Sequence, residues 1–150
     1  LAGRGWWGED WWSDAIDSGL MAIESHSWDH HHETLTRTAT GLPGGRFANV
    51  ADPAAADAEI RCASDYLDAR LPQRRTRLFA YPYGESNDYL VRDYLPRRQA
   101  EHRLEAAFDT TPTPITRGAD RWRLGRYVCG PHWNSPDALR ALLRDALGGL

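Results

Sequence analysis

The chain has 150 residues, of which 41% are hydrophobic and 26% are charged, and this composition is typical of a globular domain and not of a disordered segment. Its length favours a single domain over residues 1–150, and its formal net charge of −3 gives no reason to expect nucleic acid as a partner. No hydrophobic run is long enough to span a membrane, and the first residues do not form a signal peptide. Because the chain does not start with Met, we expect that it begins within a longer protein.

Helical and strand-like segments alternate along the chain. Helices are predicted over residues 9–18, from Pro53 to the residue before Pro72, from Ser86 or Asn87 to Pro96, over a charged turn at 97–103, and from Ser135 onward. Strands are predicted at the short segments 20–23, 76–81, 104–108 and 123–128. This alternation predicts an α/β fold with a mostly parallel sheet.

Short signals set the boundaries of several of these segments. Gly19 is suited to end the first helix in a left-handed conformation, and Asp52 followed by Pro53 is a typical helix start. The apolar run 20–23 is expected to be a buried strand that leads directly into Ser25 and the residues after it. The polar segment 34–52 is predicted to be a loop, and its length favours a functional role.

Four of the six histidines lie between Glu24 and His32. His26 and His30 are four positions apart, so a helix, or a loop entering a helix, would place both imidazoles on one side. Two neutral imidazoles favour a borderline-soft divalent ion such as zinc, although a catalytic zinc usually takes three protein ligands. The alternative interpretation is a solvated run of histidines that binds no ion.

The tryptophans and cysteines each allow two interpretations. Four of the seven tryptophans gather near the N-terminus, at Trp6, Trp7, Trp11 and Trp12. They are expected to pack against the core, and the alternative is a platform for sugar rings. Cys62 and Cys129 are either free thiols or partners in one disulfide, because they lack the spacing of a zinc knuckle or a redox pair.

A second motif ends the predicted strand 76–81. The sequence Tyr81-Pro82-Tyr83-Gly84 favours a tight turn, because proline fixes its own backbone and glycine permits conformations that other residues resist. Together with the earlier sequence Ser25-His26-Ser27-Trp28-Asp29-His30, it resembles the motifs of the polysaccharide deacetylases, the NodB-homology family of carbohydrate esterases. The resemblance extends over roughly residues 10–130.

Within the α/β class, the resemblance implies a distorted (β/α) barrel that is incomplete at its N-terminus. It also implies that His26 and His30 are two ligands of a divalent metal, for which zinc is the first choice. In the family, an Asp-Asp pair after an earlier strand supplies the third ligand and the catalytic base. No such strand and pair occur here, and Asp10 and Asp14 lie in a predicted helix, so we expect the pair to lie upstream of this chain.

The reaction that the resemblance implies is hydrolysis of N-acetyl groups on an amino-sugar polysaccharide or oligosaccharide. The metal would polarise the acetyl carbonyl and activate a water molecule. The backbone N–H of Tyr83 would donate a hydrogen bond to the oxyanion. The residues expected to contact the substrate are Trp28, Tyr81, Pro82 and Gly84.

Several positions depart from the family pattern or lie outside it. The family often has Arg two residues before the proline of the second motif, where this chain has Ala80. Its general acid is usually a late histidine, for which His132 is the only candidate; an ordinary loop histidine is the alternative. Arg126 follows the segment that resembles a late family strand, and it serves either packing or an ion pair. His31 and His32 are expected to face solvent, and the alternative is that one of them forms a hydrogen bond that supports the metal ligands.

Three functions are compatible with these motifs. The first is a metal-dependent deacetylase whose partner is an N-acetylated glycan. The second is a catalytically silent relative that binds saccharide through Trp and Tyr rings. The third is an amidase of the same superfamily that acts on a non-sugar amide. The resemblance also implies an extracytoplasmic or cell-envelope location.

Overall fold

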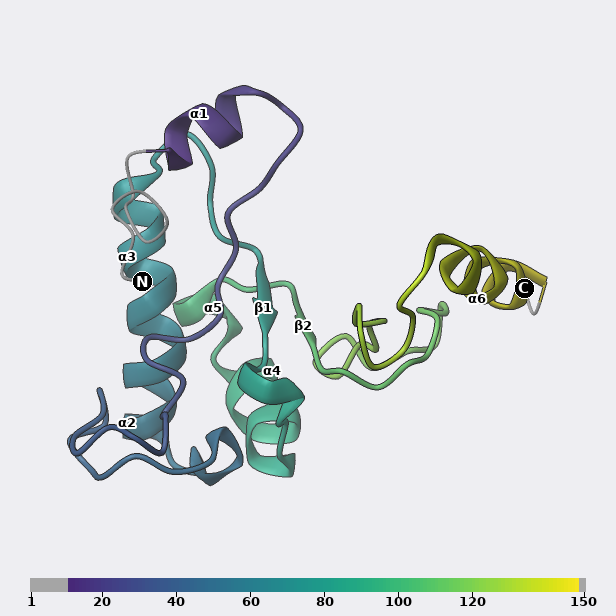
Figure 1. Ribbon diagram of the computed structural model, residues 1–150. Coiled ribbons are helices and arrows are strands. Elements are labelled where there is room, and N and C mark those ends of the chain that lie inside the picture. Colours follow the sequence, from purple (N-terminus) through teal and green to yellow (C-terminus); the bar gives the residue numbers. More distant parts are fainter. Residues whose placement is uncertain (1–10, 149–150) are drawn as a thin grey trace.

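Parallel strand segments form the centre of the computed structural model, which describes residues 11–148. β1 (Leu78–Ala80) and β2 (Ala106–Phe108) pair in parallel. Ser25 forms a parallel bridge to the other edge of β1, and Leu124 forms one to β2. The segments therefore lie side by side in chain order, and helices fill the first two connections, whereas the connection from β2 to Leu124 contains no helix (Figure 1). This arrangement belongs to the α/β class, as the alternating sequence pattern predicts.

Helices occupy most of the predicted helical segments, and the signals at their starts explain why. The bounds are α1 Trp12–Asp17, α2 Pro53–Ala56, α3 Cys62–Arg70, α4 Leu95–Arg97, α5 Gln99–His102 and α6 Pro136–Gly148, with wide π turns η2 at Asp57–Arg61 and η4 at Leu90–Tyr94 and short 3₁₀ turns η1 at Phe47–Asn49 and η3 at Pro82–Gly84. The Oδ1 atom of Asp52 accepts hydrogen bonds from the first free N–H groups of α2 at 2.9 and 3.0 Å. Asn87 Oδ1 accepts one from Leu90 N at 2.8 Å. Both predicted helix starts are confirmed.

The core lies between the strands and the helices that follow them. Phe79 and Tyr81 have no exposed surface, and their rings meet edge to face with centroids 5.2 Å apart. Ile60 enters from η2 and Leu90 from η4, so the continuous helical segment 53–70 and the next helix both cover this side of the sheet. Burial of these apolar side chains supplies the main driving force that holds the layers together.

The run 20–23 differs from its prediction as a buried strand. Only Ser25 pairs with β1, and the run before it forms no strand in the described structure. Leu20 is 89% exposed and Met21 is 54% exposed. The physical reason is that α1, the neighbouring element, buries none of its own side chains and provides no layer over the run. The predicted end of α1 is confirmed, because Gly19 has φ +69° and its N–H donates to Ile16 O.

The C-terminal segment leaves the sheet after Leu124 and ends in α6, which Figure 1 shows apart from the other helices. Ser135 Oγ accepts a hydrogen bond from Ala138 N at 3.1 Å and so caps the predicted helix start. The leucines of α6 recur on one face, yet no residue of the helix is buried. Leu143 and Leu147 are among the exposed apolar side chains. The amphipathic sequence therefore predicts the helix correctly, but the apolar face of this helix is not buried.

Cys62 and Cys129 both carry free thiols, which decides between the two interpretations that the sequence left open.

Over residues 11–148, no helix combines the length and the apolar character needed to cross a bilayer. Of the tryptophans near the N-terminus, Trp6 and Trp7 lie outside the described residues, and Trp11 is 39% exposed.

Candidate active site

His26 lies directly after the segment that pairs with β1, and the sheet fixes the orientation of its ring. Its Nδ1 atom is 2.7 Å from the carbonyl oxygen of Ala80, the last residue of β1. A carbonyl oxygen only accepts, so Nδ1 carries the hydrogen and donates it. In the neutral ring, Nε2 is then left with its lone pair. His26 is also exposed, so this nitrogen can bind a metal or a substrate.

His30 reaches the same place from a loop and not from a helix. Ser27 and His30 have φ values of +72° and +67°, a left-handed conformation that is uncommon for residues other than glycine. His30 N donates to Ser27 Oγ at 3.0 Å, and the rings of His26 and His30 meet at 4.6 Å in a T-shaped arrangement. The predicted proximity of the pair is confirmed, but the local structure that produces it is a tight loop.

The pKa of His30 lies below its ordinary value, because burial and the neighbouring His26 and His32 rings all disfavour its charged form. Nearby Asp29 opposes this shift with a smaller effect. A lowered pKa keeps the imidazole neutral at neutral pH. The neutral form is the one that ligates a metal.

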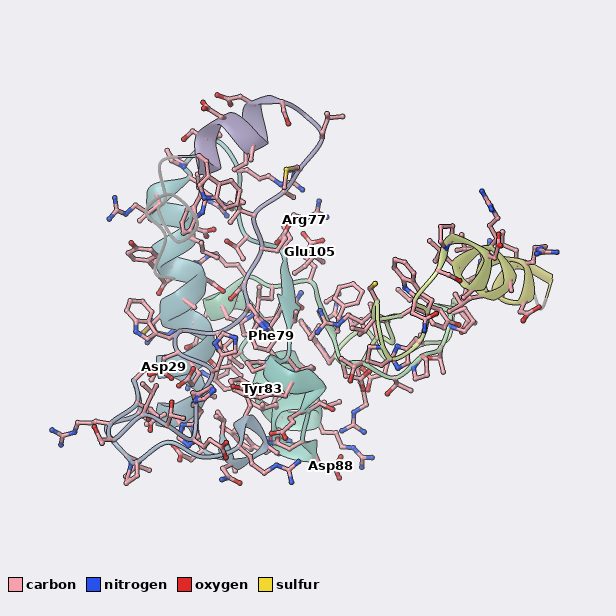
Figure 2. All side chains as sticks on the ribbon, in the orientation of Figure 1. Asp29, Arg77, Phe79, Tyr83, Asp88 and Glu105 are labelled. Carbon is pink, nitrogen blue, oxygen red and sulfur yellow. The ribbon has the colours of Figure 1, made fainter. Side chains whose placement is uncertain are left out.

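The Tyr83 turn lies at the same end of the sheet as the histidine loop. In Figure 2, Tyr83 and Asp29 lie beyond the carboxyl end of β1, whereas Arg77 and Glu105 lie near the opposite end of the strands. The Tyr83 ring lies 5.9 Å from the His30 ring and 6.0 Å from the His32 ring. The two motifs that are far apart in the sequence therefore form one cluster of aromatic and imidazole rings.

The turn itself holds its shape through close packing. Tyr83 has φ +57°, and Gly84 N donates to Tyr81 O at 2.9 Å. Gly84 has φ +73°, and a Cβ atom added there would lie 2.1 Å from Thr110 Oγ1. Gly84 is therefore required by the backbone and by the approach of Thr110, and the substrate contact expected of it stays a prediction.

Tyr81 and Pro82 differ from their predicted roles, because both side chains are fully buried. The hydroxyl of Tyr81 donates to Trp122 O at 2.8 Å, and burial raises the pKa of this phenol. A side chain without exposed surface cannot touch a substrate, so both residues pack the core beneath the turn. Residues two apart on a strand share a face, so the position of Tyr81 two residues after Phe79 was the signal for this role.

Two cavities open beside the histidine loop and the Tyr83 turn. One, of about 620 Å³, lies between α1, the run 21–24 and α3, and His26 and Trp28 line part of it. Trp28 is 51% exposed, and its ring lies 5.7 Å from that of Tyr66 on α3. The other cavity, of about 280 Å³, is lined by His32, Glu33, Gly45, Arg46, Tyr83 and Glu85. The rings of both motifs are thus accessible to a ligand.

His132 is not brought to this cluster. Its Nδ1 accepts a hydrogen bond from Val128 N at 2.8 Å, and its ring lies 6.4 Å from that of Tyr127. Both contacts fall within its own loop, which lies beyond Leu124 and leads into α6, the helix that Figure 1 shows apart from the others. This position corresponds to the loop histidine that we weighed as the alternative. Arg126, which precedes this loop, has a buried Nε without a hydrogen-bond partner among the described residues.

Sequence reasoning missed Asp29 and Glu59, which hold the histidine loop. Asp29 accepts hydrogen bonds from His31 N and Ala39 N at 2.9 and 2.6 Å. Glu59 accepts one from Asp29 N at 3.3 Å. For Glu59 the sequence did contain a signal, because this charged residue lies next to Ile60 on the apolar face of a predicted helix.

His31 is buried, which corrects the prediction that it faces solvent. Its backbone N–H is bound by Asp29, and its ring lies against the loop at Gly45. An added Cβ atom on Gly45 would lie 3.8 Å from His31 Nε2. The ring is therefore directed away from solvent by the same hydrogen bonds that shape the loop.

The donor set fits two ligand positions of a zinc site. His26 and His30 place two imidazoles on one loop, and imidazole nitrogen is a ligand type that zinc accepts. Within residues 11–148, no three or more His, Cys, Asp or Glu side chains are grouped so that they could hold a metal ion. The described residues thus bring two imidazoles together without completing the three-ligand set that a catalytic zinc usually takes.

One protein family and two solved structures resemble this chain. The family described as polysaccharide deacetylase matches residues 6–114, which is more than half of the chain. A de-N-acetylase from Aggregatibacter actinomycetemcomitans has a similar fold, with a TM-score of 0.58 at 18% identity over 86% of this chain and 50% of that one. IcaB from Ammonifex degensii gives a TM-score of 0.48 at 21% identity, over 85% of this chain and 48% of that one. The chain spans about half the length of these proteins, and no curated protein matches it.

Proposed function

Because the chain belongs to the polysaccharide deacetylase family, we propose that it is part of a metal-dependent hydrolase that removes N-acetyl groups from an amino-sugar polysaccharide or oligosaccharide. The observation that carries the proposal is the His26–His30 pair, whose rings meet at 4.6 Å beside the Tyr83 turn. Family membership supports the cleavage of an amide bond. The metal, with zinc as first choice, and the glycan substrate are the parts that we add.

Each group in this cluster has a defined task in the proposed reaction. His26 presents Nε2 because Ala80 O holds its Nδ1–H, and His30 stays neutral because burial lowers its pKa. A bound zinc ion would supply polarisation of the acetyl carbonyl and a lower pKa for water. The Tyr83 N–H would donate to the oxygen on which negative charge develops, as a fixed donor that needs no reorganisation. A role for His132 as general acid stays a prediction.

The wider architecture and location belong to the same proposal. We place the four parallel segments in a distorted (β/α) barrel that residues 1–150 form in part. By family resemblance, the protein acts outside the cytoplasm or at the cell envelope, where polymeric glycans are found. Trp28 and Tyr83, both more than half exposed, are the ring surfaces on which we expect sugar units to stack.

A catalytically silent saccharide-binding protein is the second candidate. Two observations favour it: residues 11–148 contain no cluster of three or more metal-ligating side chains, and Ala80 stands where the family often has Arg. The exposed rings of Trp28 and Tyr83 would serve binding equally well. This candidate differs from the first in one measurable property, because it needs no metal.

The test combines metal content with acetate release from N-acetylglucosamine oligomers by the purified protein. We expect about one zinc per chain and metal-dependent acetate release, both lost when His26 and His30 are replaced by Ala. Asp137→Ala, at an exposed position of α6, is the control and should change neither property. Glycan binding that persists in metal-free protein, without acetate release under any metal loading, would instead support the second candidate. Release from non-sugar acetamides alone would point to an amidase.

A further inference from the structure

Glu59 is a buried carboxyl group that the proposed reaction does not use. It lies on the π turn η2 and has no exposed surface, with Ala56 and Ile60 buried beside it. Removing a carboxyl group from water is costly unless other groups satisfy it, so its position calls for a structural or functional reason. Its neighbours across the helix surface are the residues between His26 and His30.

The contacts of Glu59 with this loop are made by both its main chain and its side chain. Its carbonyl oxygen accepts a hydrogen bond from Trp28 N at 2.9 Å. Its Oε2 accepts one from Asp29 N at 3.3 Å. These two consecutive amides are the middle of the segment that separates the two histidines. One helical residue therefore holds the centre of the loop.

Asp29 extends this hold to the residues that follow. Its Oδ1 accepts from His31 N and its Oδ2 accepts from Ala39 N. Ser27 and His30, on either side of the held amides, adopt left-handed backbone conformations. Such conformations persist in residues other than glycine only where the surroundings fix them. The contacts of Glu59 and Asp29 are the surroundings that the structure provides.

The protonation of Glu59 suits this role. Burial, and then the neighbouring Asp29 carboxylate, raise the pKa of Glu59 to about 8. Near neutral pH the group is therefore mostly a neutral acid, which avoids placing a second negative charge beside Asp29. Its Oε1 is buried without a hydrogen-bond partner among the described residues. A glutamine would be a close neutral substitute in shape and in acceptor position.

We propose that Glu59 is a positioning residue for the histidine pair: through Trp28 N and Asp29 N it fixes the loop that carries His26 and His30, and so sets their separation before any ion binds. The use of the pair as metal ligands rests on the proposed function. The fixing of the loop is a property of the metal-free protein. The two claims can therefore be measured separately.

The variants are chosen to separate the acceptor from the bulk of the side chain. Glu59→Gln keeps an acceptor oxygen, whereas Glu59→Leu keeps similar volume and removes it. Asp29→Ala removes the next acceptor, which lies in the loop itself, and it takes the place of Glu59→Leu if that variant fails to fold. Ser64→Ala is the matched control, because Ser64 is equally buried on the adjoining helix but bonds only to Ile60 O in the structure.

Two measurements are made on each purified variant. The first is amide hydrogen exchange at residues 28–31 in metal-free protein, and the second is zinc affinity by competition with a chromophoric chelator. Glu59→Leu and Asp29→Ala are expected to speed exchange at these amides and to weaken zinc binding about 10- to 100-fold, as loss of groups that orient metal ligands does elsewhere. Glu59→Gln should stay within about threefold of wild type, and Ser64→Ala should match wild type in both.

Wild-type exchange rates in Glu59→Leu, or an equal effect of Ser64→Ala, would overturn the proposal. If Glu59→Leu does not fold, wild-type amide exchange rates in Asp29→Ala would also overturn the proposal. If the protein binds no zinc, the exchange data still decide the positioning role, and only the proposed function fails. The outcomes for the two ideas are thus distinguishable in one set of samples.

Discussion

The imidazole of His102 and those of His26 and His30 occupy opposite environments in one fold. His102 has no exposed surface and lies between the rings of Tyr94 and Trp122, with centroids 5.8 Å from each. His26 lies at the carboxyl end of β1 and is exposed. Burial alone does not separate the two kinds, because His30 is itself partly buried.

The second ring nitrogen is what distinguishes the two kinds of histidine. His102 uses both: Nε2 donates to Leu95 O at 2.9 Å, and Nδ1 accepts from Leu104 N at 3.0 Å. Among residues 11–148, His26 has a hydrogen-bond partner at Nδ1 alone, where it donates to Ala80 O. A ring whose nitrogens are both taken by the main chain is part of the core. A ring held by one nitrogen is oriented and still has a lone pair to offer.

The largest effect is expected for His26→Ala. It removes a proposed ligand, so bound zinc should be lost and acetate release should fall by on the order of 10³-fold or more. Because His26 is exposed, the free energy of unfolding of the metal-free protein should change by less than about 0.5 kcal/mol. Elemental analysis, initial rates and urea unfolding measure the three quantities. Full zinc content in this variant would contradict the assignment.

His102→Ala is expected to show the reverse pattern. It leaves Leu95 O and Leu104 N without partners and opens space between two rings, at a cost of about 3 kcal/mol in the free energy of unfolding. Zinc content per folded molecule should stay at the wild-type value. Denaturant unfolding and metal analysis of the same sample make the comparison. Loss of metal without loss of stability would show that His102 acts on the site.

The proximity of the two motifs could be predicted, because the carboxyl ends of parallel strands meet at one edge of a sheet. The helix starts at Asp52 and Asn87 could also be predicted from the sequence. Each depends on a hydrogen bond from a nearby backbone N–H to the side chain, and Asp and Asn are residue types that commonly accept such bonds at helix starts. The family resemblance drawn from these motifs is confirmed by the match over residues 6–114.

The loop conformation could not be predicted, because it depends on contacts with a distant helix. Spacing suggested that His26 and His30 share one side of a helix, but Glu59, some thirty positions away in the chain, helps to hold the left-handed residues between them. Likewise, the apolar run 20–23 and α6 carry patterns that are normally buried. The spacing of apolar residues predicts which face of an element is apolar. Whether that face is buried depends on which other helices and strands pack against it.

Glu59 and His102 should give the stability curve opposite slopes with pH. The pKa of Glu59 is raised from 4.5 to about 8, so its contribution is full below pH 4.5 and is lost as the pH rises through about 8. Burial lowers the pKa of His102 from 6.5, so its contribution is full above pH 6.5 and is lost as the pH falls below it. Each slope is at most about 1.4 kcal/mol per pH unit.

Urea unfolding of wild type, Glu59→Gln and His102→Gln between pH 5 and 9 tests these signs. Relative to wild type, Glu59→Gln should remove a fall in the free energy of unfolding as the pH rises from 5 to about 8, and His102→Gln a fall as the pH drops below 6.5. The charge of Asp29 helps to raise the pKa of Glu59, so Asp29→Asn should end the first fall at a lower pH. The same pH dependence in Glu59→Gln and wild type would show that Glu59 is ionised across this range.

The smallest effect is expected for Tyr83→Gly, which separates a backbone donor from its side chain. If the oxyanion donor is the Tyr83 N–H, kcat should stay within about threefold, since glycine keeps the N–H. Tyr83 has φ +57°, which glycine adopts without strain, so the turn itself should be preserved. Loss of the ring that lies against His30 and His32 should appear mainly as a raised KM. Steady-state kinetics give both values, and a kcat reduced by more than about tenfold would assign the catalytic role to the ring or its hydroxyl.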